Sequence, residues 1–478
     1  MNNLILSNVS FIIMSIDILK CIIIRLSHLV VLNHIHISGI GILFAVLVIT
    51  MICCSAYATP TQQASTTIES DKNAKQVTLT ATLVQPKPRW DMLLKSAIQK
   101  LQERHPDISI KVNYTVLPYD VSRTTMLNLL ANRSSVDLIS LDQIWLGNFA
   151  EQGYLTDLSN RALNWGRLSD WYEGNLDGNL YKGKVYAIWA WTDVRGIWYW
   201  KDLLNKAGVD PNSLNTWDGY IASAKKLIGA LKSQNIQGIG LDCGASMWYP
   251  YLWMLGGEII KMRDGHPTKG SYWFPAFNSS AGVKAMQFIK DQIRTGLKPI
   301  ANGNFDTISF INRTYAVFLG GSWLPGEFPS NESSTIIQRV GFIPAYPVPR
   351  QGVQTTTVMG GWELGIPQTS KNKDLAWELI TLMLEPDVLA PVLEKTGYLP
   401  TQTSIGQGIF SHTLEKAIPY YDKMLSMVKI GRGRPNIPEF AQIDDYITES
   451  GKQVCTNLKE PKQALDDAAV KSAKLLGW

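Results

Sequence analysis

Two charged residues stand between strongly apolar runs near the middle of the chain. Asp193 and Arg195 lie between residues 185–191 and 197–200, both rich in the Val, Ile and Trp that favour buried strands. An isolated charge in such a setting is costly unless it is paired or serves a ligand. The stretch 183–210 therefore holds an internal ion pair or offers a carboxylate to a molecule that enters from solvent.

Another carboxylate follows a second short apolar run. Asp142 comes directly after residues 136–141, which read as a buried strand, and Trp145 stands three residues further on. A carboxylate in this position either N-caps the next helical turn or accepts hydrogen bonds from a bound molecule. Both roles are open on the sequence.

Aromatic residues indicate which molecule would suit these carboxylates. All 16 tryptophans follow residue 89. The C–H faces of a pyranose lie well on aromatic rings, and its hydroxyl groups pair with carboxylate, amide and guanidinium groups. Tryptophan together with Asp, Glu, Asn and Arg is a moderately specific pattern for carbohydrate binding.

The motifs of several enzyme classes do not occur. The chain has no G-x-S-x-G, no H-E-x-x-H and no G-x-x-x-x-G-K-[ST], and the glycines at 238 and 240 do not continue into a dinucleotide fingerprint. We expect neither a metal nor a cofactor. A glycosidase needs two carboxylates that flank one bond, and the sequence leaves convergence of Asp142, Asp193, Glu258 and Glu363 open.

Composition describes an exported globular protein. The chain has 478 residues, 45% of them hydrophobic and 18% charged, with a net charge of +5 and no basic stripe that would suit nucleic acid. Residues 1–58 are apolar and end in an A-x-A-like site, so they predict a signal peptide or membrane anchor. Residues 59–76 are polar and predict a flexible linker. Cys243 and Cys455 either pair or lie buried apart.

The mature chain begins with an α/β pattern. Residues 77–84 alternate as a strand, residues 90–104 form an amphipathic helix, and residues 108–116 form a second strand. Ligands of open α/β sheets bind beyond the carboxyl ends of the strands. The loop 86–90, which ends in Trp90, occupies such a place.

Four segments resemble one family. Residues 183–210, 136–158 (VDLISLDQIWLGNFAEQGYLTDL), 314–326 and 358–379 are similar to motifs of the extracellular solute-binding proteins of family 1, of the maltose- and trehalose-binding type, which serve sugar ABC importers. Residues 431–442 resemble the R-P-x-x-P segment of the same family. The resemblance covers residues 77–450.

The resemblance implies an α/β, two-lobe periplasmic-binding-protein-like fold with three interlobe crossovers and a central ligand cleft. We expect lobe 1 to comprise residues 77–190 and 314–362, and lobe 2 to comprise residues 191–313 and 363–478. The crossovers are expected in 183–210, in 314–326 and in 358–367. The cleft would close around its ligand by hinge motion.

The same resemblance implies the residues of the site. Asp142 and Asp193 would accept sugar hydroxyls, Trp323 would stack on a pyranose, and Gly360 and Gly361 would offer backbone amides. The full set of expected ligand-binding residues is Trp90, Arg123, Asp142, Trp145, Trp191, Asp193, Trp248, Tyr249, Trp323, Gly360, Gly361, Trp362 and Arg434. Trp248 and Tyr249 are as readily explained as core residues.

The implied function is that of a monomeric, non-enzymatic binding protein outside the cytoplasm, near the membrane through its N-terminal segment. Its partners would be a carbohydrate and the permease of an ABC importer, and no nucleic acid. A ligand-binding sensor and a carbohydrate-active enzyme are the alternatives. Arg123 and Arg195 leave a phosphorylated or acidic sugar open as the ligand.

Overall fold

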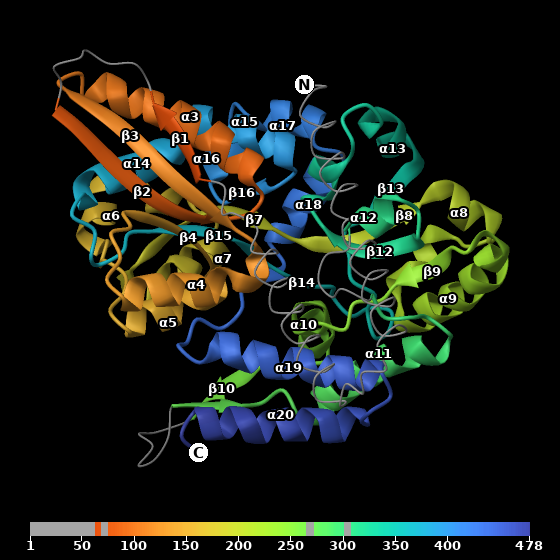
Figure 1. Ribbon diagram of the computed structural model, residues 1–478. Coiled ribbons are helices and arrows are strands. Elements are labelled where there is room, and N and C mark those ends of the chain that lie inside the picture. Colours follow the sequence, from red (N-terminus) through yellow and green to blue (C-terminus); the bar gives the residue numbers. More distant parts are fainter. Residues whose placement is uncertain (1–62, 68–74, 264–271, 301–306) are drawn as a thin grey trace, which may run out of the picture. The chain divides into compact units, whose positions relative to one another are not determined.

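The computed structural model describes residues 63–67, 75–263, 272–300 and 307–478. The expected signal peptide or anchor, residues 1–58, lies outside the described residues. No helix among the described residues has both the length and the apolar character needed to cross a membrane. The unit Gln62–Trp478 forms one compact body, and its two larger sheets are shown in Figure 1.

The first sheet has seven strands and forms the core of what we call lobe 1. Its strand order is β1 (Gln63–Thr67), β3 (Ile108–Leu117), β2 (Lys75–Val84), β4 (Leu138–Asp142), β15 (Gly360–Gly365), β7 (Ala187–Asp193) and β16 (Leu399–Pro400). Strands β3, β2 and β4 are parallel, and β15 runs antiparallel to both β4 and β7. The parallel part matches the predicted strand, helix, strand pattern.

Helices lie on both sides of this sheet. Figure 1 shows α3 and α15 on one side and α4 and α5 on the other. Helix α3 buries its predicted apolar face, which carries Leu94, Ile98 and Leu101 at helical spacing. The helices of this lobe are α3 (Lys87–Arg104), α4 (Tyr119–Ala131), α5 (Leu146–Glu151), α6 (Ser159–Trp165), α7 (Glu173–Leu176), α14 (Lys373–Met383), α15 (Pro386–Thr396), α16 (Thr403–Gly406) and α17 (Ser411–Ala417), with the short hairpin β5 (Leu180–Tyr181) and β6 (Lys184–Val185).

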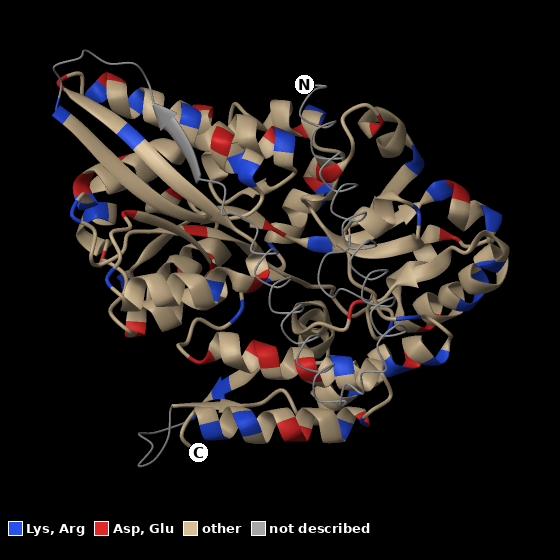
Figure 2. Cartoon of the chain, in the orientation of Figure 1, with Lys and Arg blue, Asp and Glu red and all other residues tan. Residues whose placement is uncertain are grey.

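The second sheet has four strands and forms the core of lobe 2. Its order is β13 (Val340–Ile343), β8 (Arg195–Trp200), β12 (Tyr315–Gly321) and β9 (Gln237–Gly240). The surrounding elements are α8 (Lys201–Lys206), α9 (Trp217–Leu231), α10 (Ala245–Met254), α11 (Ser280–Arg294), α12 (Thr307–Ile311), α13 (Ser333–Arg339), α19 (Phe440–Cys455), α20 (Pro461–Leu475) and the hairpin β10 (Ile260–Met262) and β11 (Trp273–Pro275). Helix α18 (Tyr421–Val428) follows α17 and precedes the third passage between the sheets. Figure 2 shows basic and acidic residues interspersed along α19 and α20, in keeping with the small net charge.

The chain passes between the sheets three times. It leaves β7 for β8, returns from β13 to β15, and leaves β16 for α19, which packs on α10 and α11 of lobe 2. The second and third passages pair with each other, because β14 (Thr357–Val358) runs parallel to β17 (Gly431–Arg432). All three passages are therefore tied within one narrow region.

Two expected boundaries differ from the strand order. Residues 314–326 were expected to cross into lobe 1, but β12 lies between β8 and β9 in the second sheet. Residues 363–478 were expected in lobe 2, but β15 extends to Gly365 and both β16 and α15 belong with lobe 1. The partner of a strand depends on distant residues, and a local apolar run does not specify it.

A strand also occurs in the expected linker. The backbone of Gln63–Thr67 pairs antiparallel with β3. The outer edge of β3 presents unpaired N–H and C=O groups that can accept such a strand. The expectation of an unstructured segment over all of 59–76 is wrong for these five residues and for Lys75 and Gln76, which open β2.

Cys243 and Cys455 form a disulfide that joins the loop after β9 to the end of α19, with Cα atoms 6.4 Å apart. The bond closes a long loop, since 212 positions separate the two cysteines. Constraint of the unfolded chain is the main source of stability from such a bond.

We expect the double variant Cys243→Ser/Cys455→Ser to lose about 2–5 kcal/mol of unfolding free energy. Urea titration followed by circular dichroism measures the loss. Wild-type protein in reductant serves as the comparison and should shift by a similar amount, while the double variant should not respond to reductant. Equal stability of variant and wild type would show that the bond contributes nothing.

Candidate functional site

The first passage between the lobes carries the buried charged pair. Strand β7 ends at Asp193 and β8 begins at Arg195, and side chains two positions apart in an extended chain point to the same side. Arg195 Nη1 lies 3.0 Å from Asp193 Oδ1, and both side chains are buried. Of the two possibilities left by the sequence, the structure shows an internal ion pair.

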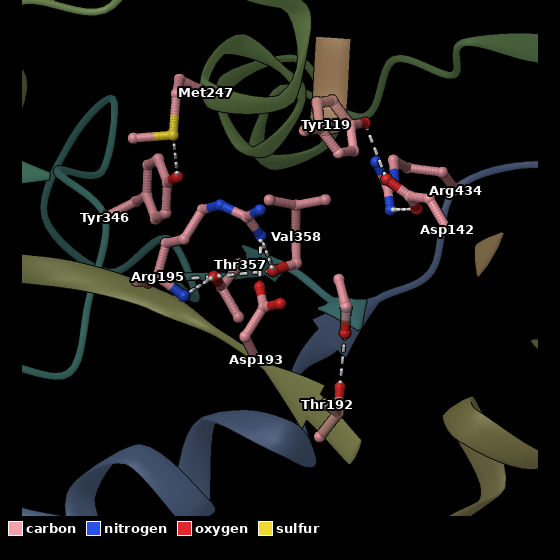
Figure 3. Close-up of polar contacts among 11 residues, drawn as sticks. Tyr119, Asp142, Thr192, Asp193, Arg195, Met247, Tyr346, Thr357, Val358 and Arg434 are labelled. Atoms are coloured by element: carbon pink, nitrogen blue, oxygen red, sulfur yellow. Dashed lines mark hydrogen bonds and ion pairs between the residues drawn. The ribbon is translucent and has the colours of Figure 1, made fainter. Parts of the chain in front are cut away.

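The pair is tied to the second passage. Arg195 donates from Nη1 to the carbonyl oxygen of Val358 at 3.2 Å and from its backbone N–H to Thr357 Oγ1 at 3.0 Å. The Thr357 hydroxyl in turn donates to the Arg195 carbonyl oxygen at 2.9 Å (Figure 3). Burial raises the pKa of Asp193, and the charges of Arg195 and Arg434 partly oppose this rise.

Two glycines let the second passage approach the first. A Cβ atom on Gly360 would lie 2.8 Å from Asp193 Oδ1. Gly361 has a φ of 145°, and a Cβ atom there would lie 2.2 Å from the Trp191 carbonyl oxygen. Larger residues would clash at both positions, so close approach of the two strands accounts for both glycines.

Aromatic rings from both lobes surround this junction. We call Trp90, Trp191, Trp323, Trp362, Tyr398, Tyr119 and Trp145 the aromatic cluster. Ring centroids lie 5.0 Å apart for Trp90 and Trp191, 6.1 Å for Trp191 and Tyr398, and 6.1 Å for Tyr398 and Trp323. Trp323 comes from lobe 2, whereas Tyr398 comes from lobe 1, so this stacked contact spans the two lobes.

The cluster continues along the strand ends of lobe 1. Trp362 lies 6.0 Å from Tyr119 and 6.5 Å from Trp145 between ring centroids. The guanidinium of Arg89 lies within 5.5 Å of the ring centroids of Trp90, Trp191, Trp362 and Tyr398 and connects the two parts of the cluster. Five expected residues, Trp90, Trp145, Trp191, Trp323 and Trp362, thus occupy one region.

A second buried ion pair lies at the end of β4. Arg434 Nη2 donates to Asp142 Oδ1 at 2.7 Å, and the Tyr119 hydroxyl donates to Oδ2 at 2.9 Å (Figure 3). Asp142 also accepts from the Ile144 backbone N–H at 3.4 Å and so caps the turn that follows. Of the two roles foreseen for this carboxylate, the structure shows the cap, and acceptance of hydrogen bonds from a ligand stays a prediction.

Electrostatics keep Arg434 charged. Burial alone would lower the pKa of Arg434, but Asp142 and Tyr119 hold it above its ordinary value. The pair joins lobe 1 to the third passage, because Asp142 ends β4 and Arg434 follows β17. Each interlobe passage therefore carries a buried polar contact.

Two further acids lie near this pair, Glu363 fully buried and Asp444 half-buried. Burial raises the pKa of Glu363 well above its ordinary value, and repulsion from Asp142 adds to the rise. Burial also raises the pKa of Asp444 on α19 to about 6. Tyr249 donates its hydroxyl to Asp444 Oδ1 at 2.6 Å.

A cavity of about 260 Å³ adjoins Arg434. Its lining combines two indole rings with charged and amide groups, and includes Trp253, Trp273, Glu258, Arg432 and Asn436. Arg432 pairs with Glu258 at 2.9 Å. The space lies between the segment 432–437 and the β10–β11 hairpin, next to the second ion pair.

Three expected residues lie away from the aromatic cluster. Arg123 on α4 forms a partly exposed ion pair with Asp445 at 3.2 Å. Trp248 and Tyr249 are buried in the core of lobe 2, and Tyr249 packs against Trp253. Their burial fits the core alternative, and a ligand-binding role for either residue stays a prediction.

The sequence interpretation missed Arg89, Tyr119 and Tyr398. Arg89 stands in the predicted ligand-facing loop 86–90, but that loop was assigned a role only through Trp90. Tyr119 opens a helix directly after a strand, which was a usable signal. Tyr398 belongs to no motif, and only the pairing of β16 with β7 brings it to the site.

The chain was compared with known proteins. Residues 91–390 match the model of the bacterial extracellular solute-binding protein family. The chain belongs to this family. Its members act outside the cytoplasm as the family description states, and this solute-binding protein has the two-lobe periplasmic-binding-protein-like fold.

Relatives of this solute-binding protein span most of its length. A binding protein of Brucella abortus is 25% identical over 386 residues, covering 77% of this chain and 86% of that protein. The mannitol-binding protein of Pseudomonas aeruginosa is 23% identical over 404 residues, covering 80% and 90%. A solved Thermotoga lettingae ABC transporter solute-binding protein with α-D-tagatose has a TM-score of 0.72 at 24% identity, covering 84% and 100%.

The raised pKa of Asp444 predicts a pH-dependent stability. The folded-state pKa of about 6 exceeds the ordinary 3.8, so the folded state binds more protons between these values, and stability falls as pH rises through this window. Relative to wild type, Asp444→Asn should therefore gain about 2 kcal/mol of unfolding free energy between pH 4 and pH 7. Urea titrations across this range measure the difference, with Asp445→Asn as the control. A constant difference would contradict the raised pKa.

Proposed function

We propose that this solute-binding protein binds a sugar or sugar alcohol and delivers it to the permease of an ABC importer. The observation that carries the proposal is the aromatic cluster, which combines rings from both lobes with the buried ion pairs of Asp193 and Asp142 at the interlobe passages. A molecule held at this junction contacts both lobes and so favours their closed arrangement.

The residue types fit a polyhydroxylated ligand. Indole and phenol rings offer apolar faces for C–H groups, while Asp142, Asp193 and Arg434 offer acceptors and donors for hydroxyl groups. Rings supply affinity, and buried hydrogen-bonding groups reject ligands that leave them unpaired. The cavity beside Arg434 extends the region available to a larger ligand.

The relatives support the same ligand class. One relative is named for mannitol, and one structural neighbour was solved with α-D-tagatose. Both ligands are polyhydroxylated, one a sugar alcohol and one a ketose. For this chain we therefore propose a polyhydroxylated ligand and do not name one compound.

We favour binding over catalysis because three of the four candidate carboxylates are already engaged in ion pairs, and Glu363 alone cannot supply both carboxyl groups that a glycosidase needs. Asp142 and Asp193 each form a buried pair with an arginine, and Glu258 pairs with Arg432. A glycosidase needs one carboxyl group as proton donor and a second as base or nucleophile at the same bond. A sensor would share every feature of the site and differ by its protein partner.

The N-terminal segment would place the protein at the outer face of the membrane. We propose that residues 1–58 act as an export signal or anchor and that the protein works as a monomer. Lipidation, cleavage and retention give different masses for the mature chain, so intact-mass measurement of exported protein distinguishes these outcomes.

Trp323 should contribute strongly to ligand affinity. We expect Trp323→Ala to weaken sugar binding by about 30-fold or more, because a buried aromatic contact spanning both lobes is removed. Isothermal titration with mannitol, tagatose and a panel of mono- and oligosaccharides measures the change. Trp165→Ala is the matched control, since Trp165 packs against Trp171 and Trp377 elsewhere in lobe 1.

Asp193 offers a second test by the same titration. Asp193→Asn keeps the side-chain shape but removes its charge, and we expect about 10-fold or greater loss of affinity without turnover of the bound sugar. Asp202→Asn is the control, because Asp202 pairs with Arg313 and Arg339 at a more exposed position. Unchanged affinity in both Asp193→Asn and Trp323→Ala would place the ligand elsewhere.

A further inference from the structure

A third buried arginine lies inside the aromatic cluster. Arg89 stands in the first turn of α3, directly after the loop that follows β2, and is 1% exposed. Its guanidinium carbon lies 4.8 Å from the ring centroid of Trp191, 5.0 Å from Tyr398, 5.2 Å from Trp90 and 5.5 Å from Trp362. Four rings therefore enclose this cation at the junction of the lobes.

Only one nitrogen of the Arg89 guanidinium is satisfied. Nη2 donates to the carbonyl oxygens of Gln85 at 2.8 Å and Val84 at 3.3 Å. Nε and Nη1 are buried and have no acceptor in hydrogen-bonding geometry among the described residues, although the Tyr398 side chain lies near enough to raise the pKa of Arg89. These two nitrogens together carry three N–H groups that a ligand could satisfy.

Arg89 also differs from the other two arginines of the site in its charge balance. Arg195 pairs with Asp193 and Arg434 pairs with Asp142, whereas no carboxylate in the described ranges forms an ion pair with Arg89. Burial lowers the pKa of Arg89, and Tyr398 and Asp193 only partly oppose this effect. Arginine nevertheless stays charged in proteins.

An unpaired buried cation is costly, and cation–π contacts offset part of that cost. A neutral ligand would leave the charge without a counterion. An anionic group would supply the missing charge and acceptors for the free N–H groups, in short charge-assisted hydrogen bonds.

We infer that Arg89 binds an anionic oxygen group of the ligand, a carboxylate or a phosphate, and that this protein therefore selects acidic sugars over neutral ones. The inference rests on the proposed function and specifies its substrate class. Arg89 would be a specificity-determining residue, and the four aromatic rings around it would hold the carbon skeleton of the sugar.

A purely structural role for Arg89 makes a different prediction. Through Val84 and Gln85 the side chain holds the loop after β2, so its loss would lower stability and weaken every ligand alike. A charge-recognition role changes the preference between charged and neutral ligands. The ratio of affinities is therefore the decisive quantity.

The experiment is isothermal titration of the full chain with matched ligands. D-glucose, D-galactose and D-mannitol are each compared with the corresponding carboxylate (D-glucuronate, D-galacturonate, D-mannonate) and with the corresponding sugar or sugar-alcohol phosphate. We expect at least one anionic ligand to bind about 10- to 100-fold more tightly than its neutral counterpart, the range typical of hydrogen bonds to charged groups. Which of the two anions binds better identifies the carboxylate or the phosphate as the natural group.

Variants at position 89 test the assignment. Arg89→Met should reduce the anionic preference to near unity, and Arg89→Lys should keep part of it. Arg104→Met is the matched control, because it removes an arginine from the same helix at an exposed ion pair. If Arg89→Met does not fold by circular dichroism, the preference of the wild type and of Arg89→Lys decides.

Equal binding of neutral and anionic sugars by the wild type would overturn the inference and leave the proposed function intact. An anionic preference that survives Arg89→Met, or fails to fall in Arg89→Lys, would also overturn it. Absence of binding in every series would contradict the inference together with the proposed function.

Discussion

The buried ion pair between Asp193 and Arg195 is the interaction on which the junction of the lobes depends. It forms across a single intervening residue, exactly where one sheet ends and the other begins. Either charge alone would destabilise the folded protein in this interior. Removal of one partner from a buried ion pair lowers stability more than replacement of both partners by apolar residues. The second passage lies close to this ion pair. Gly360 leaves space for the Asp193 carboxylate because it has no Cβ atom, and the Thr357 hydroxyl donates to the Arg195 carbonyl oxygen.

The rings and the second ion pair complete this arrangement. Trp323 from lobe 2 stacks on Tyr398 from lobe 1, and Arg434 after the third passage binds Asp142 at the end of a lobe 1 strand. Charged groups set the polarity of the junction, whereas the rings exclude water from it and strengthen the electrostatic contacts. This combination supports the proposed sugar-binding role, in which we infer that Arg89 selects the charge of the ligand.

Local features of the fold could be predicted from the sequence, and long-range pairing could not. The alternation in β2 and the apolar face of α3 gave the opening of lobe 1, and the family motifs gave Asp142, Asp193, Trp323 and Trp362 as neighbours. The assignment of β12 to lobe 1 was wrong because the sequence of an apolar strand does not specify which strand it pairs with. Arg89 was missed because arginine in a loop usually lies at the surface. Its burial depends on four aromatic rings that come from separate segments of the chain.

The hydrogen-bonded pairing of β14 with β17 has a mechanical consequence. These two-residue strands join the second and third passages, while Thr357 joins the second passage to the first. Three interlobe passages without contacts between them would each bend independently. Because these three share hydrogen bonds, they must bend together, and we call them the hinge band. Twisting or sliding of one lobe against the other would break the shared bonds, so the easiest relative motion is a rotation about a single axis across the hinge band.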